Sequence, residues 1–318
     1  MTDFPIDGHT QLVGLIGWPV AHSLSPAMHN AAFEVLGLNW RYVPLPVPPG
    51  QAETAVRGLT ALGFRGANVT VPHKQAVMPA LDTIDVHARA LGAVNTLVVG
   101  RGANGTPTIG GYNTDASGFV GALREGGFEP QRGGSAVVVG AGGAARAVVS
   151  GLLRSGSGEI TILNRTPERA EALVSERRGE EETRGQGDKG TRRQGDVPER
   201  AGRLRALPLT AETLVESTRA AGLLVNATTV GMWPHVGGSV WPDAVPVPAH
   251  LTVFDLVYNP LETRLLRQAR NSGAHTIDGL GMLVRQGALA FDMWTNQGLE
   301  VDEIATLMRA ACERVLGT

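Results

Sequence analysis

The chain has 318 residues, of which 42% are hydrophobic and 18% charged, and its formal net charge is −2. This length suggests two domains with a substantial core. The small net charge provides no general attraction to nucleic acid or anionic lipid, so neither is expected as a partner.

The cysteine, histidine and hydropathy patterns argue against several further classes of protein, namely disulfide-stabilised, metal-binding and membrane proteins. Cys312 is the only cysteine, which excludes an intrachain disulfide and a multi-cysteine zinc cluster. The histidines show no ligand pair of the His-Glu-x-x-His type, so no metal site is expected. The N-terminal residues lack the features of a signal peptide, and no apolar run approaches the roughly 18 residues that span a bilayer. We therefore expect a soluble cytoplasmic protein.

Short strand-like runs alternate with helical patterns, which predicts an α/β fold. In the N-terminal part a helix is expected from Ser25 toward Gly37, with strands at 11–17, 41–45, 67–71, 94–99 and 106–109. After Asp115 the alternation becomes more regular, and strands are expected at 135–139, 160–163, 223–226, 252–255 and 275–278. Helical spacing then continues to the C-terminus.

The segment 176–203 departs from this alternation. It contains eight positive and seven negative residues, and its only apolar residues are Val197 and Ala201. So few apolar groups cannot offset the entropy of ordering the chain. We therefore predict a solvated, flexible surface insertion here.

A glycine-rich turn follows the strand predicted at 135–139. In this turn Gly140 allows a tight bend, Gly142 allows the backbone to approach a pyrophosphate, and Ala145 occupies the helix-packing position of the G-x-G-x-x-A pattern. The amides at the start of the following helix favour a bound anion. The strand before the turn and the helix after it indicate a dinucleotide-binding turn.

The end of the next strand distinguishes NADP from NAD. An NAD-binding fold usually carries an acidic residue there, which holds the ribose diol. In this chain Asn164, Arg165 and Thr166 occupy the position, with Arg169 one turn later. The two arginines could hold a 2′-phosphate by charge-assisted hydrogen bonds. The segment could also simply cap a helix with Pro167 at its first position, and both interpretations can hold. We favour NADP.

Polar residues also gather in the N-terminal part. Ser23 and Ser25 lie at a helix start and could bind a carboxylate, although Ser25 alone could be an ordinary N-cap. Thr70 and Lys74 come near the carboxyl end of a strand, where open α/β sheets bind ligands, and a helix is expected from Pro72.

Two further segments supply an amide and a carboxylate. Asn95 lies among apolar residues and could simply satisfy backbone groups in a turn. Asp115 and Thr114 precede a helix rich in small residues, and either could be only a cap.

Taken in order, these segments resemble the shikimate dehydrogenases over almost the whole chain. The motifs that carry the resemblance are Gly17-x-Pro19, Ser23-x-Ser25-Pro26, Asn68-Val69-Thr70-Val71-Pro72-x-Lys74, Gly92-Ala93-Val94-Asn95-Thr96, Asn113-Thr114-Asp115, Gly140-Ala141-Gly142-Gly143-Ala144, Asn164-Arg165-Thr166, Asn226-Ala227-Thr228, Asp255-x-Val257-Tyr258-Asn259-Pro260 and Asp278-Gly279-x-Gly281-Met282-Leu283.

The resemblance implies an N-terminal α/β substrate and catalytic domain over 1–115, completed by 283–318, and a Rossmann-type NADP-binding domain over 116–282 that carries the 176–203 insertion. It implies the reversible NADPH-dependent reduction of 3-dehydroshikimate to shikimate, in chorismate and aromatic amino-acid biosynthesis. A quinate/shikimate dehydrogenase that uses NAD and a non-catalytic dinucleotide-binding sensor stay open as alternatives. Related enzymes are often homodimers, but the sequence indicates no interface.

The resemblance also assigns roles to individual residues. The catalytic pair would be Lys74 and Asp115, with Lys74 either donating a proton or stabilising the oxyanion that hydride delivery creates. Substrate would be bound by Ser23, Ser25, Thr70, Asn95, Tyr258 and Gln286. NADP would be bound by Gly140, Ala141, Gly142, Gly143, Ala144, Asn164, Arg165, Thr166, Arg169, Leu256 and Gly279, with Leu256 standing where many members carry methionine.

Overall fold

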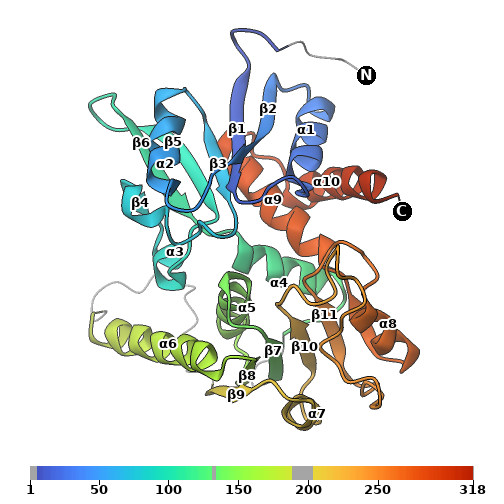
Figure 1. Ribbon diagram of the computed structural model, residues 1–318. Coiled ribbons are helices and arrows are strands. Elements are labelled where there is room, and N and C mark those ends of the chain that lie inside the picture. The colour runs from blue at the N-terminus through green and yellow to red at the C-terminus, as the bar shows by residue number, and fades with distance from the viewer. Residues whose placement is uncertain (1–5, 131–133, 188–202, 318) are drawn as a thin grey trace. The chain divides into compact units, whose positions relative to one another are not determined.

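The computed structural model describes residues 6–130, 134–187 and 203–317. Contacts between residues divide the chain into two compact units. Unit 1 comprises Met1–Gly118 and Leu283–Thr318, and unit 2 comprises Phe119–Met282. In Figure 1 the blue and cyan elements and the red C-terminal helices belong mainly to unit 1, and the green to orange elements belong mainly to unit 2. The predicted α/β class is confirmed.

Unit 1 is built on a six-stranded sheet of order β2-β1-β3-β5-β6-β4. The first three strands of this order are parallel, whereas β5 pairs antiparallel with β3 and with β6. The strands are β1 (Gln11–Gly17), β2 (Trp40–Pro46), β3 (Gly66–Val69), β4 (Thr83–Ile84), β5 (Thr96–Arg101) and β6 (Pro107–Tyr112). The helices are α1 (Ser25–Val35), α2 (Ala52–Ala61), α3 (Val86–Leu91), α4 (Asp115–Glu125), α9 (Leu280–Thr295) and α10 (Val301–Leu316). Helices α4 and α9 each contain a boundary between the two units.

Unit 2 is a parallel sheet of order β12-β11-β10-β7-β8-β9. The order reverses direction between β7 and β10, which is the switch point where doubly wound sheets bind dinucleotides. Buried apolar clusters cover both of its faces. The strands are β7 (Ser135–Val139), β8 (Glu159–Asn164), β9 (Arg203–Pro208), β10 (Leu223–Asn226), β11 (Thr252–Asp255) and β12 (His275–Ile277). The helices are α5 (Gly143–Arg154), α6 (Pro167–Gly187), α7 (Ala211–Thr218) and α8 (Arg264–Asn271).

The helix expected from Pro72 is absent from the described residues. The chain there forms turns and then a short 3₁₀ helix, Met78–Ala80. Pro79 limits the length of any α-helix that starts at Pro72, because it lacks the N–H that an α-helix needs and its ring would clash with the carbonyl of the preceding turn. Lys74 therefore lies on a turn and not on a helix.

The segment predicted as a flexible insertion begins as a helix. Helix α6 continues to Gly187, where a loop was expected, and residues 188–202 lie outside the described residues. Glutamate and arginine are good helix formers, which accounts for the extension. The ion pair between Arg146 on α5 and Glu176 also ties the start of the segment to the preceding helix. Its last residue, Arg203, begins β9, a strand that was not predicted.

None of the helices in the described ranges is long and apolar enough to span a bilayer. The apolar side chains are instead buried within each unit. Helix α5 buries one apolar face, and the last five residues of strand β1 are buried. Buried parallel strands of this kind are continuous apolar runs, because helices cover both sides of them.

His29 is a neutral histidine enclosed by aromatic rings in unit 1. Its ring stacks on Tyr42 at a centroid distance of 4.4 Å and lies 5.3 Å from the ring of Trp294. Neither ring nitrogen has a hydrogen-bond partner among the described residues. Burial lowers the pKa of His29 to about 3, and the neighbouring Asn68 side chain acts in the opposite direction without forming a hydrogen bond to the ring.

We expect His29 to make the fold sensitive to acid. In the unfolded chain this histidine is protonated below a pH of about 6.5, whereas in the folded protein it stays neutral down to about pH 3. The free energy of unfolding therefore decreases as the pH is lowered from about 6.5 to about 3. The loss should be about 2–3 kcal/mol at pH 4.5. Urea unfolding at neutral pH and at pH 4.5 should show a smaller acid loss in His29→Phe than in the wild type. The exposed His87→Phe should keep the wild-type loss, and equal losses in both variants would contradict the assignment.

Candidate active site

An ion pair between Lys74 and Asp115 lies at the centre of the predicted site. The Lys74 Nζ is 2.6 Å from the Asp115 Oδ2, and the two side chains are 20% and 8% exposed. The turn after β3 positions Lys74, whose carbonyl accepts the Val94 N–H at 2.8 Å. Asp115 is the first residue of α4. The pair therefore joins a turn and a helix start within unit 1, in a setting with little water to screen it.

Asn95 holds the second oxygen of the carboxylate. Its Nδ2 donates to the Asp115 Oδ1 at 2.8 Å and to the Thr114 Oγ1 at 2.9 Å. Its Oδ1 accepts the Thr114 N–H at 2.8 Å. A backbone N–H can only donate, so this bond fixes the orientation of the amide and directs its NH2 to Asp115. Asn95 thus forms hydrogen bonds to the side chains of Thr114 and Asp115, and does more than satisfy backbone groups in a turn.

Gln286 on α9 completes the cluster from the far end of the chain. Its Oε1 lies 3.3 Å from the Asn95 Nδ2, and its Nε2 donates to the Leu283 carbonyl at 2.8 Å. Close packing of α9 on α4 allows this, because a Cβ at Gly118 would lie 2.8 Å from the Gln286 backbone nitrogen. The structure thus brings together four of the predicted residues, Lys74, Asn95, Asp115 and Gln286.

The capping interpretation does not account for Thr114 and Asp115. Asn113 makes the capping bond, since its Oδ1 accepts the Asp115 N–H at 3.0 Å. The Thr114 hydroxyl instead faces Asn95 and Gln286. Thr114 and Gly118 are absent from the predicted site. The sequence signal for Thr114 is its place between Asn113 and Asp115, whereas nothing marks Gly118 among the other small residues of α4.

Ser23 and Ser25 lie in the segment that connects β1 to α1. The Ser25 N–H donates to the Ser23 Oγ at 3.2 Å, and Leu24, not Ser25, holds the N-cap position. The ordinary N-cap interpretation of Ser25 is therefore wrong. Strands β1 and β3 are adjacent, and the Trp18 N–H donates to the Val71 carbonyl at 3.0 Å. The segment with Ser23 and Ser25 and the turn with Thr70 therefore both lie beyond the carboxyl ends of these two parallel strands.

In unit 2 the glycine turn lies at the carboxyl end of β7. Gly140 has a φ of +118°, and a Cβ there would lie 2.9 Å from the Ala227 carbonyl oxygen, so both conformation and space require glycine. Apart from the chain neighbours of Gly142, no atom of the described residues lies within 4 Å of a Cβ built there, which leaves this side of the turn open. The amides at the start of α5 follow directly, an arrangement that suits a pyrophosphate.

Arg165 and Arg169 flank the start of α6. Both side chains are exposed, and neither forms an ion pair within the described parts of the chain. The Asn164 Nδ2 donates to the Thr166 carbonyl at 2.8 Å and closes the turn that carries them. Two cations near the positive end of a helix dipole are unfavourable unless an anion joins them. The residues present therefore fit the phosphate of NADP.

A buried carboxylate orders the segment after β11. Asp255 is fully buried and accepts hydrogen bonds from Asn226 at 2.8 Å and from Thr263 at 2.6 Å. Burial raises the pKa of Asp255 to about 6, and the hydrogen bonds act in the opposite direction. A Cβ at Gly279 would lie 2.3 Å from the Leu256 carbonyl oxygen, so these two predicted cofactor residues are in contact.

Tyr258 lies two residues beyond Leu256 in unit 2. Its contact with substrate stays a prediction.

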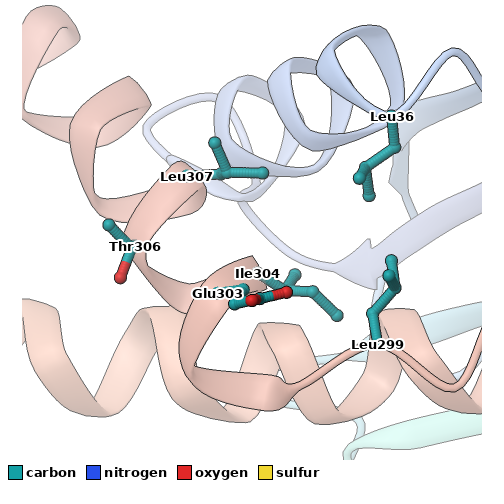
Figure 2. A pocket seen from close by; sticks show the side chains of 6 residues that line it. All are labelled: Leu36, Leu299, Glu303, Ile304, Thr306 and Leu307. Carbon is teal, nitrogen blue, oxygen red and sulfur yellow. The ribbon is translucent and has the colours of Figure 1, made fainter.

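Two pockets lie away from these residues. One, of about 350 Å³, lies where α10 begins and is lined by Leu36, Leu299, Glu303, Ile304, Thr306 and Leu307 (Figure 2). The other, of about 490 Å³, includes the first residues of β7, β10 and β11, at the opposite ends of these strands from the glycine turn. None of the predicted site residues lines either pocket. No cluster of three His, Cys, Asp or Glu side chains in the described ranges could hold a metal ion.

Comparisons with known proteins agree with the motifs. Family models match residues 15–97 as the shikimate dehydrogenase substrate binding domain, 124–186 as shikimate/quinate 5-dehydrogenase, and 279–312 as the shikimate 5'-dehydrogenase C-terminal domain. A relative from Methanopyrus kandleri, shikimate dehydrogenase (NADP(+)), is 46% identical over 93% of this chain and 94% of its own length. The chain belongs to the shikimate dehydrogenase family.

Solved structures of shikimate dehydrogenases share the fold. One, in complex with NADP+, is 37% identical, covers 98% of each chain and has a TM-score of 0.81. Another, from Thermus thermophilus in complex with NADP(H) and shikimate, is 38% identical, covers 95% of this chain and 100% of its own, and has a TM-score of 0.76. The family predicted from the motifs is therefore confirmed.

Proposed function

We propose that this chain catalyses the reversible reduction of 3-dehydroshikimate to shikimate by NADPH, a step toward chorismate and the aromatic amino acids. The observation that carries the proposal is the Lys74–Asp115 pair, with Asn95 bonded to the second carboxylate oxygen. The Methanopyrus kandleri relative bears the name of this activity, and the Thermus thermophilus structure contains both NADP(H) and shikimate. NADP is the cofactor.

Lys74 can protonate the carbonyl oxygen of the substrate or stabilise negative charge on it. Bound NADPH supplies a hydride to the carbonyl carbon, and the oxygen then requires a proton or a neighbouring cation. The ammonium of Lys74 can supply either. Both Asp115 oxygens accept hydrogen bonds, one from Lys74 and one from Asn95, so the carboxylate orients the ammonium. In the reverse direction the pair would accept the proton of the substrate hydroxyl.

The remaining polar residues suit the rest of the substrate. Ser23 and Ser25 would bind its carboxylate with hydroxyl and backbone donors. Thr70, Asn95 and Gln286 would bind ring hydroxyls, and Tyr258 would contact the substrate. These roles rest on the family motifs and, for Asn95 and Gln286, on their place beside Asp115.

Unit 2 would hold the cofactor at its switch point. The turn from Gly140 to Ala144 would bind the pyrophosphate, and Leu256 and Gly279 would lie beside the nicotinamide. Asn164, Arg165, Thr166 and Arg169 would hold the adenosine end. The exposed arginines at the start of α6, which form no ion pair with the described residues, support this assignment.

A cytoplasmic location and a homodimer are part of the same proposal. Both rest on the resemblance of the motifs, and light scattering over a range of protein concentrations measures the oligomeric state. A mass of one chain at every concentration would contradict the homodimer.

A single kinetic comparison tests the function. The wild type is assayed by NADPH absorbance with shikimate and with quinate, each with NADP and with NAD. We expect the highest kcat/KM for shikimate with NADP. A preference for quinate or NAD would favour the quinate/shikimate dehydrogenase alternative, and no turnover with any combination would favour a dinucleotide-binding sensor.

A further inference from the structure

A chain of buried side-chain hydrogen bonds continues behind Asn95, away from Lys74. It runs from Tyr42 on β2 through Asn68 on β3 to Thr96 on β5, and from there to Asn95. All four side chains are at most 5% exposed. Water is excluded from them, so a donor lost from this chain is not replaced by solvent.

Sheet geometry brings the middle of the chain together. Asn68 and Thr96 are directly paired residues of the antiparallel strands β3 and β5. Paired residues of this kind have side chains on the same face. Tyr42 comes from β2, with β1 between it and β3, and its long side chain reaches Asn68 across that strand.

The hydrogen bonds run in one direction. The Asn68 Nδ2 donates to the Asn95 carbonyl, which can only accept, so the amide of Asn68 has one orientation. Its Oδ1 is then left to accept the Tyr42 hydroxyl at 2.9 Å. The Nδ2 also donates to the Thr96 Oγ1 at 3.3 Å, which leaves the single hydroxyl proton of Thr96 for the Asn95 Oδ1 at 3.0 Å.

The last hydrogen bond of this chain is the one that the Asn95 NH2 donates to the Asp115 carboxylate. The Asn95 Oδ1 accepts the Thr114 N–H at 2.8 Å, the Thr96 hydroxyl at 3.0 Å and, over a longer 3.3 Å, the Thr114 hydroxyl. Removing the Thr96 hydroxyl takes away one of these three donors and also leaves the Asn68 NH2 without one of its acceptors. The amide of Asn95 would then be held less firmly, and with it the carboxylate that orients Lys74.

We propose that Thr96 and Tyr42 are positioning residues for the Lys74–Asp115 pair, acting through the side chain of Asn95. Backbone groups set the direction of each amide, and the two hydroxyls add a second hydrogen bond that holds the amide in place, so that the Asn95 NH2 stays on Asp115. Neither hydroxyl needs to touch substrate for this role. The inference rests on the proposed function, because its effect is read in shikimate turnover.

Thr96→Val tests the role with almost no change in shape, since an isosteric methyl replaces the hydroxyl. We expect kcat for shikimate to fall about tenfold and the KM for NADP to stay within about twofold of the wild-type value. Thr96→Ser is the matched control, and it should restore kcat because it restores the hydroxyl. Unchanged kcat in a folded Thr96→Val enzyme, or an equal loss in Thr96→Ser, would overturn the proposal.

The Asn95→Ala background separates positioning from general damage to the core. If Thr96 acts through the side chain of Asn95, adding Thr96→Val to Asn95→Ala should change kcat less than about twofold. The same tenfold loss in that background would show a structural effect that bypasses Asn95, and would overturn the proposal. An inactive wild type would contradict the proposed function instead.

A second pair of variants covers the case in which Thr96→Val does not fold. Tyr42→Phe keeps the ring that stacks on His29 and removes the phenol hydroxyl, which also interacts with Ser25, so an effect through Ser25 is recognised by a higher KM for shikimate. Tyr112→Phe makes the same change in a half-buried tyrosine of unit 1 whose hydroxyl is outside this chain of bonds. We expect a lower kcat in the Tyr42 variant alone, with unchanged KM for NADP. Equal kcat in the two variants would overturn the proposal.

Discussion

Lys74→Ala is expected to lower turnover about 10²–10⁴-fold, the usual contribution of a positioned acid or base, while the binding of NADPH changes little. The variant removes the only cation bonded to Asp115 in the described residues, and with it the group proposed to meet the charge on the carbonyl oxygen. Steady-state kcat with shikimate and a fluorescence titration of NADPH measure the two quantities separately. The chain offers a matched control in Lys189→Ala, because Lys189 is its only other lysine. Near-normal turnover in Lys74→Ala would remove the residue from the mechanism.

Lys74→Arg separates the two roles that are open for Lys74. Arginine keeps the positive charge and its hydrogen-bond donors, but its guanidinium does not release a proton at physiological pH. If Lys74 is the proton donor, the arginine variant should be nearly as slow as the alanine variant. If Lys74 acts as a fixed cation beside the oxyanion, the arginine variant should retain most of the difference between alanine and wild type. The ratio of the two kcat values therefore assigns the role.

Much of the fold could be predicted because its central strands have an unambiguous pattern. Strands β7, β10 and β11 are short apolar runs buried on both faces, and their predicted bounds agree with the structure. Strand β9 was missed because arginines alternate with its apolar residues at the edge of the sheet. The helix expected after Pro72 was wrong, since the chain forms turns and then a 3₁₀ helix there, and Pro79 leaves room for fewer than two helical turns.

The sequence predicts which residues make up the candidate site better than it predicts how their side chains are oriented toward one another. Motif order identified Lys74, Asn95 and Asp115, but the direction of the Asn95 amide depends on Thr114 and Thr96, which the motifs do not distinguish from ordinary buried threonines. Gln286 joins the cluster from 191 positions away. That contact depends on how closely α9 packs on Gly118, which no local pattern specifies. Helix packing and donor direction are properties of the folded chain, so they could not be predicted from these segments separately.

Replacing both Arg165 and Arg169 by glutamine should reverse much of the preference for NADPH over NADH. The two exposed cations at the start of α6 would lose their charge-assisted hydrogen bonds to a 2′-phosphate, which NADH does not carry. Bonds of this kind contribute roughly 1.5–3 kcal/mol each, so we expect the KM for NADPH to rise by about 10²-fold or more while that for NADH changes little. Arg154→Gln is the control, because it makes the same kind of substitution at one exposed arginine at the other end of α5 from the glycine turn. The ratio of kcat/KM for the two cofactors is the measured quantity, and an unchanged ratio in the double variant would mean that the 2′-phosphate is held by other residues.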